Sequence, residues 1–283
     1  MAKIADMVRK TGDKTIVLFQ SRSLRLLSVT ALLLLGAAGQ ALAAPSLQDP
    51  FQSTQWPQLR QEFLGTGQAF FDSRVKVVGP RFADDPMNVP IAVDASALVA
   101  DGLRVVRMVV VVERNPIRKV LEFMPDGVLP RLAFRFKLEQ ASPVRVAVLD
   151  DQGVWHIGGV QVDASGGGCT VAGVTRADGS WSRTLNNVQT RFFQDILGGS
   201  AARLRMRIMH PMDTGLVAGI PAFYIEQLRL SDAAGQAVLR LALYEPVSEN
   251  PTFSFDFGSR PRTALQLVGS DNNGNRVAAE VVP

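Results

Sequence analysis

The chain has 283 residues, with 30 Lys and Arg against 26 Asp and Glu, and a sequence pI near 9.6. Six of the basic residues and only two of the acidic residues lie within the first 43 positions, so the remainder holds 24 of each. This neutral balance argues against nucleic acid or an anionic membrane as the partner. The 47% hydrophobic content is enough for one large domain or two smaller ones.

The N-terminal segment has the pattern of a secretory signal peptide. Arg22 and Arg25 precede an apolar run from Leu26 to Ala38, and small residues follow, which predicts cleavage after Ala43. The run is shorter than the roughly 20 residues that span a bilayer, so an uncleaved anchor is the less favoured alternative. We therefore expect residues 1–43 to be a signal peptide and the mature chain to be exported and free of the membrane.

Six short β-like runs follow, and turn residues separate them. They are 74–78, 89–93, 103–113, 131–139, 144–149 and 155–162. In the run from 131 to 138 the apolar residues alternate, which predicts a strand with one buried face. Val105–Val112 is almost wholly apolar and rich in Val, which predicts a strand covered on both faces. The spacing of these runs suggests a β-sandwich.

The pattern lapses over residues 170–200, which we interpret as a linker. Val188, Phe192 and Ile196 recur there at helical spacing, which predicts a short amphipathic helix between Asn187 and Gly198. Six further β-like runs then predict a second all-β domain over 201–283. These runs are 203–210, 222–230, 236–244, 252–257, 263–269 and 276–282.

Cys169 is the single cysteine of the chain and follows Gly166, Gly167 and Gly168. Three glycines leave the backbone free, so we expect the thiol to be presented on a flexible arm. An odd cysteine in an exported chain indicates intermolecular pairing or a working thiol, with an inert loop cysteine as the alternative. Because there is no second cysteine, the remaining roles are covalent attachment or oxidation of one sulfur.

The two histidines are weaker candidates. His156 could act as a general base toward Cys169, although a structural role near a strand end is the default. His210 begins the segment His210–Gly215, whose His and Asp side chains could bind a metal ion. With only two histidines in different predicted domains, we expect no metal site, and we interpret that segment as a turn that could serve an interface.

Several motifs together resemble a known family. Trp155–Val160 followed by the cysteine loop, after Asn88–Ile91 and Asn115–Pro116, resembles the SoxY subunit of the periplasmic sulfur-oxidation carrier. Four later segments resemble the partner subunit, SoxZ. They are His210–Gly215, Ile220–Ala222, Ser248–Phe255 and Asp271–Gly274. The mature chain is thus similar to a fused SoxYZ carrier of the kind associated with quinoprotein dehydrogenases.

This resemblance implies two immunoglobulin-like β-sandwich domains packed together, SoxY-like over 55–169 and SoxZ-like over 201–283. It implies a periplasmic, non-catalytic carrier without a cofactor, whose Cys169 holds a sulfur intermediate and passes it between partner enzymes. The family arm ends its subunit with Gly-Gly-Cys-Gly-Gly, whereas Cys169 is followed by Thr170–Gly173 and another domain. The arm is therefore tethered at both ends, which puts processing of thiosulfate itself in doubt.

Three hypotheses follow for the function. The first is the carrier, which serves periplasmic sulfur-oxidation or quinoprotein dehydrogenase enzymes. The second is a non-covalent accessory module for a periplasmic quinoprotein dehydrogenase, in which the sandwich surface matters more than the thiol. The third, a cysteine-dependent enzyme, requires His156 beside Cys169.

Overall fold

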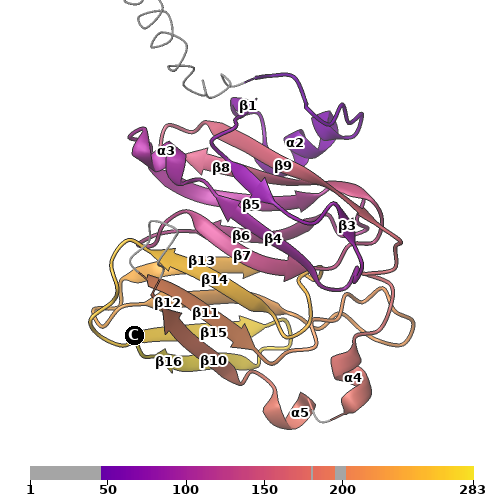
Figure 1. Cartoon of the computed structure of the whole chain (residues 1–283). Helices are drawn as coiled ribbons and strands as arrows, with labels where there is room; N and C mark the ends of the chain where they lie inside the picture. The colour runs from indigo at the N-terminus through magenta and orange to yellow at the C-terminus, as the bar shows by residue number, and fades with distance from the viewer. Residues whose placement is uncertain (1–45, 180, 195–201) are drawn as a thin grey trace, which may run out of the picture. The chain divides into compact units, whose positions relative to one another are not determined.

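The computed structural model describes residues 46–179, 181–194 and 202–283 (Figure 1). The predicted signal peptide, residues 1–43, lies outside the described residues. Among the residues that are described, no helix is long and apolar enough to cross a bilayer.

The N-terminal domain, as we define it, holds nine strands and two helices. The strands are β1 (Ala69–Phe71), β2 (Lys76–Val78), β3 (Phe82–Ala83), β4 (Val89–Asp94), β5 (Val105–Val112), β6 (Lys119–Met124), β7 (Arg131–Phe136), β8 (Ser142–Asp150) and β9 (Trp155–Ala164). The helices are α2 (Trp56–Leu64) and α3 (Ser96–Ala100).

The described part of the C-terminal domain holds seven strands, and two short helices precede it. The helices are α4 (Val174–Asp178) and α5 (Trp181–Thr184). The strands are β10 (Val188–Phe193), β11 (Ala202–Ile208), β12 (Ile225–Ser231), β13 (Ala237–Leu243), β14 (Thr252–Phe257), β15 (Leu265–Asp271) and β16 (Arg276–Val281). The all-β class and the two β-sandwich domains predicted from the sequence are confirmed.

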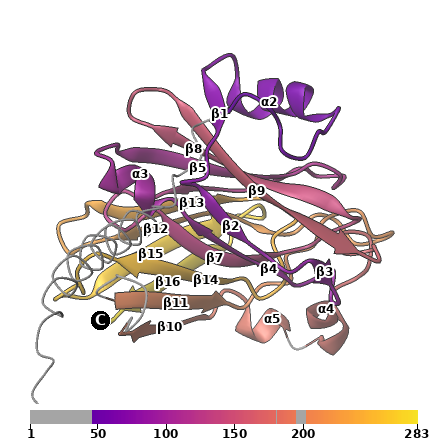
Figure 2. The same cartoon turned by 45° about the horizontal axis from the view of Figure 1, so that its top comes forward.

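The strands form two sheets, and each sheet runs through both domains (Figures 1 and 2). The ten-stranded sheet has the order β1-β9-β8-β5-β6-β13-β12-β15-β16, with β3 pairing to β9. The six-stranded sheet has the order β10-β11-β14-β7-β4-β2. The two domains therefore meet edge to edge in both layers, which removes four exposed strand edges.

We call the two cross-domain strand pairs the seam. In the ten-stranded sheet β6 pairs antiparallel with β13, so that Phe123 lies opposite Leu241. In the six-stranded sheet β14 pairs antiparallel with β7, so that Phe255 lies opposite Leu132. The rings of Phe123 and Phe255 are 5.7 Å apart between the layers, and one hydrophobic core includes residues of both domains. The predicted interface within the chain is thus a shared core.

Helix α2 explains why β5 is apolar on both faces. Val110 and Val112 point into the main core, whereas Val109 and Val111 belong to a second cluster with Trp56 of α2. Apart from Val106, which is 36% exposed near the start of the strand, each Val side chain of β5 is buried on one face or the other. The sequence prediction of a strand covered on both faces is confirmed.

The predicted helix at 187–198 is wrong. Residues 188–193 form strand β10, which pairs with β11 along its whole length. Val188, Thr190 and Phe192 are half-buried and alternate with exposed residues, so the period of two outweighs the helical spacing. The range 170–200, interpreted as a linker, contains α4, α5 and this strand, and residues 195–201 lie outside the described range.

Candidate functional site

Cys169 lies between the two domains, in the loop that follows β9. Its side chain is 1% exposed, and its Sγ donates to the backbone oxygen of Lys137 at 3.6 Å. The sequence-based expectation of an exposed thiol on a flexible arm is therefore wrong for this structure. The loop is docked against the protein.

The glycines before Cys169 allow this docking. Gly167 has φ of +87°, a backbone conformation that other residues rarely adopt. A Cβ at Gly168 would lie 2.3 Å from the backbone oxygen of Pro86 and 2.5 Å from that of Leu138. Any side chain at 168 would collide with backbone, so this glycine is required by close approach rather than by mobility.

Glu139 binds the loop from the N-terminal domain. Its carboxylate accepts from the Cys169 backbone N–H at 2.9 Å and from the Thr170 hydroxyl at 3.0 Å. Its backbone oxygen accepts from the N–H of Gly167 at 3.1 Å. The loop is therefore held by three hydrogen bonds to Glu139 and not by regular strand pairing.

Asn115 supports the strand end that receives the loop. Its side-chain amide donates to the backbone oxygen of Lys137 at 2.7 Å and accepts from the backbone N–H of Glu139 at 2.8 Å. Asn115 is 2% exposed, so its polar groups are satisfied inside the protein. The Asn-Pro pair noticed in the sequence thus has a structural role next to Cys169.

The C-terminal domain covers the cysteine through the segment His210–Gly215. The Thr214 hydroxyl donates to the backbone oxygen of Cys169 at 2.6 Å. The backbone oxygen of Met212 accepts from Nζ of Lys137. This segment therefore serves the interface between domains, as the sequence suggested, and the described residues contain no cluster that could hold a metal ion.

Burial controls the ionisation of the thiol. Desolvation and, to a smaller extent, the charge of Glu139 raise the pKa of Cys169, the charge of Lys137 opposes them, and the net result is a pKa of about 12. A thiol with this pKa is ionised in only about one molecule in 10⁵ at pH 7, so the docked cysteine is a very poor nucleophile. Burial also lowers the pKa of Lys137, which is 3% exposed.

The segment after Cys169 is anchored to the C-terminal domain. Glu249 accepts from the backbone N–H of Thr175 at 2.9 Å, and the Asn250 side chain donates to the Thr175 hydroxyl at 2.8 Å. Arg176 forms an ion pair with Asp213 at 2.7 Å. The arm is consequently held on both sides, by β9 before it and by α4 after it.

His156 is occupied elsewhere. Its two ring nitrogens lie 2.8 Å from Asp72 and 3.0 Å from Asp150, and the residue is 5% exposed. None of the hydrogen bonds found for Cys169 involves it. The structure therefore supports a structural role for His156 and not the role of general base toward Cys169.

His210 is buried with an unusual environment. Its Nδ1 accepts from the Met212 backbone N–H at 3.0 Å, and its ring lies 4.4 Å from that of Phe223. Its Nε2 lies 3.5 Å from Asp271 and makes no hydrogen bond. Desolvation lowers the pKa of His210 to about 4, so the imidazole is neutral at pH 7.

Sequence reasoning singled out Cys169 and several residues around it, but missed Lys137 and Glu139. Glu139 is the last residue of a predicted strand. Nothing in the local sequence indicates that its carboxylate accepts a hydrogen bond from a loop 30 residues away. An acidic residue at the end of an alternating strand, near a Gly-rich loop, is the only signal that the sequence offers.

Comparison with protein families gives two matches in tandem. The model described as "Sulfur oxidation protein SoxY" matches residues 60–169 and ends at Cys169, and the model described as "Sulphur oxidation protein SoxZ" matches residues 193–282. Comparison with curated proteins gave no match.

Among solved structures, the sulfur carrier protein SoxY from Chlorobium limicola f thiosulfatophilum is similar at 16% identity and a TM-score of 0.33. The match covers 39% of this chain and 96% of that one. The family assignment rests on the two models, which together account for more than half of the 283 residues. The chain thus belongs to the SoxY and SoxZ families and is a fused SoxYZ-like protein.

Proposed function

We propose that the protein is a periplasmic sulfur carrier that binds a sulfur intermediate covalently at Cys169. The membership in the SoxY and SoxZ families supports a sulfur-oxidation role, and a carrier need not be an enzyme. The periplasmic location is inferred from the signal-like pattern around residues 22–43. The single observation that carries the proposal is the position of the only cysteine, at the end of the SoxY match and under a loop of the SoxZ domain.

The attachment chemistry is thiol exchange with a sulfur–sulfur bond on a partner protein. The Cys169 thiolate attacks one sulfur of that bond, a new S–S bond forms, and the partner's thiolate leaves with the electron pair. The proton that Cys169 loses is balanced by the proton that the leaving thiolate gains. No external oxidant is needed, because the oxidation state is carried in with the partner's bond.

The docked loop described above is the closed state of this carrier. In it Cys169 is neither reachable nor ionised, so exchange requires the loop to leave its site. The loop connects Ala164, the last residue of β9, to Val174, the first residue of α4. If both ends stay in place, five residues on each side of Cys169 reach at most about 17 Å. That distance is enough to enter a shallow cleft on a partner.

The test is the intact mass of the protein purified from its native host without reductant. A carrier gives a population with added mass that dithiothreitol removes, and the Cys169→Ser variant lacks that population. A fully unmodified protein under conditions where the host oxidises reduced sulfur compounds would contradict the carrier role.

The burial of Cys169 also suits the alternative of a non-covalent accessory module for a periplasmic quinoprotein dehydrogenase. The two functions separate in the Cys169→Ser variant. A carrier loses its function in the host while its fold persists, whereas an accessory module keeps both its function and its partner binding.

A further inference from the structure

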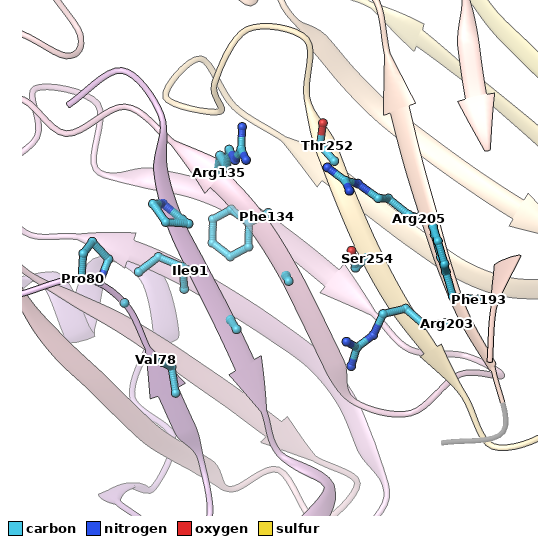
Figure 3. A pocket seen from close by; sticks show the side chains of 14 residues that line it. Val78, Pro80, Ile91, Phe134, Arg135, Phe193, Arg203, Arg205, Thr252 and Ser254 are labelled. Atoms are coloured by element: carbon cyan, nitrogen blue, oxygen red, sulfur yellow. The ribbon is translucent and has the colours of Figure 1, made fainter. Parts of the chain in front are cut away.

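The outer face of the six-stranded sheet carries a groove that crosses the seam (Figure 3). The groove has a volume of about 560 Å³ and is lined by strands β4 and β7 of one domain and β11 and β14 of the other. A second hollow of about 370 Å³ shares Arg135, Arg205 and Thr252 with it. Neither hollow contains Cys169.

One row of residues across this face has its charges compensated. Arg203 on β11 lies opposite Asp256 on β14 and pairs with it at 2.6 Å. Arg131 on β7 lies opposite Asp94 on β4 and pairs with it at 3.0 Å, and it lies 3.8 Å from Asp256. This row alternates acid and base, as is usual where cross-strand neighbours stabilise a sheet.

The neighbouring rows carry arginines without acids. Arg191 lies directly opposite Arg205, and Arg207 lies opposite Thr252. Arg135 lies opposite Pro90. In the part of the chain that the structure describes, Arg135, Arg205 and Arg207 form no ion pair. Like charges directly opposite each other destabilise a sheet, so this arrangement costs stability in the free protein.

Short side chains lie between these arginines. Thr252 and Ser254 of β14 and Ala133 of β7 line the groove. Figure 3 shows Arg205 extending toward Thr252 from one side, with Arg135 on the other side. The floor therefore offers hydroxyl donors, and the walls offer guanidinium donors, which is the chemistry that binds carboxylates in bidentate fashion.

The acids nearest to the groove offset only part of its charge, because two of them line the second hollow beside three arginines. Asp85 and Glu249 line the second hollow, but each accepts a backbone N–H, from Met87 and Thr175 respectively. Neither forms an ion pair with the arginines. Because Glu249 also anchors Thr175, six residues after Cys169, this end of the groove adjoins the segment that holds the cysteine loop.

We propose that the arginine groove, defined by Arg135, Arg205 and Arg207, docks an extended acidic segment of a partner protein. Alternate residues of a strand are about 6.8 Å apart, so carboxylates at every second position of an extended segment match Arg205 and Arg207 on β11. The two hollows, of about 560 Å³ and 370 Å³, are far larger than one small oxyanion. A docked partner would lie beside the loop that carries Cys169, although the inference does not depend on what Cys169 binds.

The experiment measures binding of a fluorescein-labelled peptide, in which five Glu alternate with five Ser, by fluorescence anisotropy at low salt. The groove variant combines Arg135→Glu with Arg205→Glu. The matched control combines Arg262→Glu with Arg276→Glu, which makes the same change in net charge at exposed positions outside the groove. Thermal unfolding of each variant checks the fold, and Arg135→Gln with Arg205→Gln replaces the groove variant if charge reversal prevents folding.

We expect the groove variant to bind the peptide at least tenfold more weakly, the Gln version at least threefold more weakly, and the control less than twofold more weakly. Three results would overturn the proposal. The peptide could fail to bind at low salt, or both charge-reversal variants could weaken binding equally, which would indicate general attraction. Sodium sulfate could also displace the peptide far better than sodium chloride at equal ionic strength, which would assign the groove to a small oxyanion.

Discussion

Two of the regions where the domains meet differ in kind. At the seam, two antiparallel strand pairs and buried rings such as Phe123 and Phe255 form one core. At the cysteine loop, the contacts are a few hydrogen bonds to Glu139, Leu138 and Thr214, without regular sheet pairing. Burial of the apolar side chains at the seam stabilises the fold by about 25 cal/mol for each Å² removed from water. Each hydrogen bond at the loop contributes only about 1 kcal/mol.

This difference implies that the loop can open while the seam stays closed. Local opening requires a free energy far below that of global unfolding when few apolar contacts are lost. The fused chain would then keep its two domains in fixed register and expose only the thiol.

The largest effect is expected from Phe255→Ala. Phe255 of β14 is fully buried, and its ring faces Phe123 of the other sheet. Loss of this ring leaves a cavity in the shared core. The free energy of unfolding should fall by about 3–5 kcal/mol. Urea denaturation followed by tryptophan fluorescence measures this change. The matched control is Phe82→Ala, at a side chain 53% exposed, and should change stability by less than about 1 kcal/mol.

The Phe255→Ala variant also tests whether the domains unfold as one. A shared core predicts a single transition in both proteins. Two separate transitions in the wild type would show that the seam does not couple the domains.

The next effect concerns pH and His210. Its pKa is lowered from 6.5 to about 4 by burial, so the unfolded chain binds a proton more readily. The resulting stability is present above pH 6.5 and is lost as the pH falls toward 4, with about 2 kcal/mol gone by pH 5. The free energy of unfolding at pH 7 and pH 5 measures this loss, which should be smaller in His210→Gln. Equal pH dependence in the two proteins would contradict the buried neutral imidazole.

At the loop, Gly168→Ala should undock the cysteine. The added Cβ would collide with the backbone oxygens of Pro86 and Leu138. These two residues are hydrogen-bonded to each other just after β7, so neither can shift without moving the backbone of the other. Cys169 should then react with a chromogenic disulfide reagent at least tenfold faster, while the melting temperature changes by only a few degrees. Gly258→Ala is the control, because its Cβ would meet only one atom, at 3.9 Å. A large fall in melting temperature without faster labelling would mean that the loop and the core are one unit.

The smallest effect is expected from Thr214→Val, which removes the hydroxyl that binds the Cys169 backbone oxygen. Loss of this hydrogen bond should favour the open loop by about 1 kcal/mol, or roughly fivefold in the rate of thiol labelling. Thr190→Val on β10 should leave the labelling rate unchanged. Slower labelling in Thr214→Val would indicate that the hydroxyl promotes opening.

Much of this arrangement could be predicted from the sequence. The alternating runs gave twelve strands close to their observed positions, and the lone Cys169 marked the candidate site. Strands β1, β3 and β6 were missed, and β10 was predicted as a helix. Strand β6 is the most instructive of these, because its apolar residues Val120, Leu121 and Phe123 fit a buried strand. Its role at the seam depends on pairing with β13, more than 100 residues away, which no local pattern encodes.

The environment of Cys169 could not be predicted for the same reason. A Gly-Gly-Gly-Cys sequence fits a mobile arm and a tightly docked loop equally well. The choice depends on Pro86, Leu138 and Thr214, which belong to three distant segments. Local sequence determined which residue carries the thiol, and tertiary packing determined whether water reaches it.

The most direct test of the account compares the labelling of Cys169 in the native protein with global unfolding. The rate of reaction with iodoacetamide is measured at several reagent concentrations, alongside the unfolding rate from urea jumps and the rate for a short peptide containing 165–173. A loop that opens locally predicts labelling much slower than in the peptide but much faster than global unfolding. Labelling at the rate of global unfolding would show that Cys169 is a structural core residue, and labelling as fast as in the peptide would show that the loop does not dock.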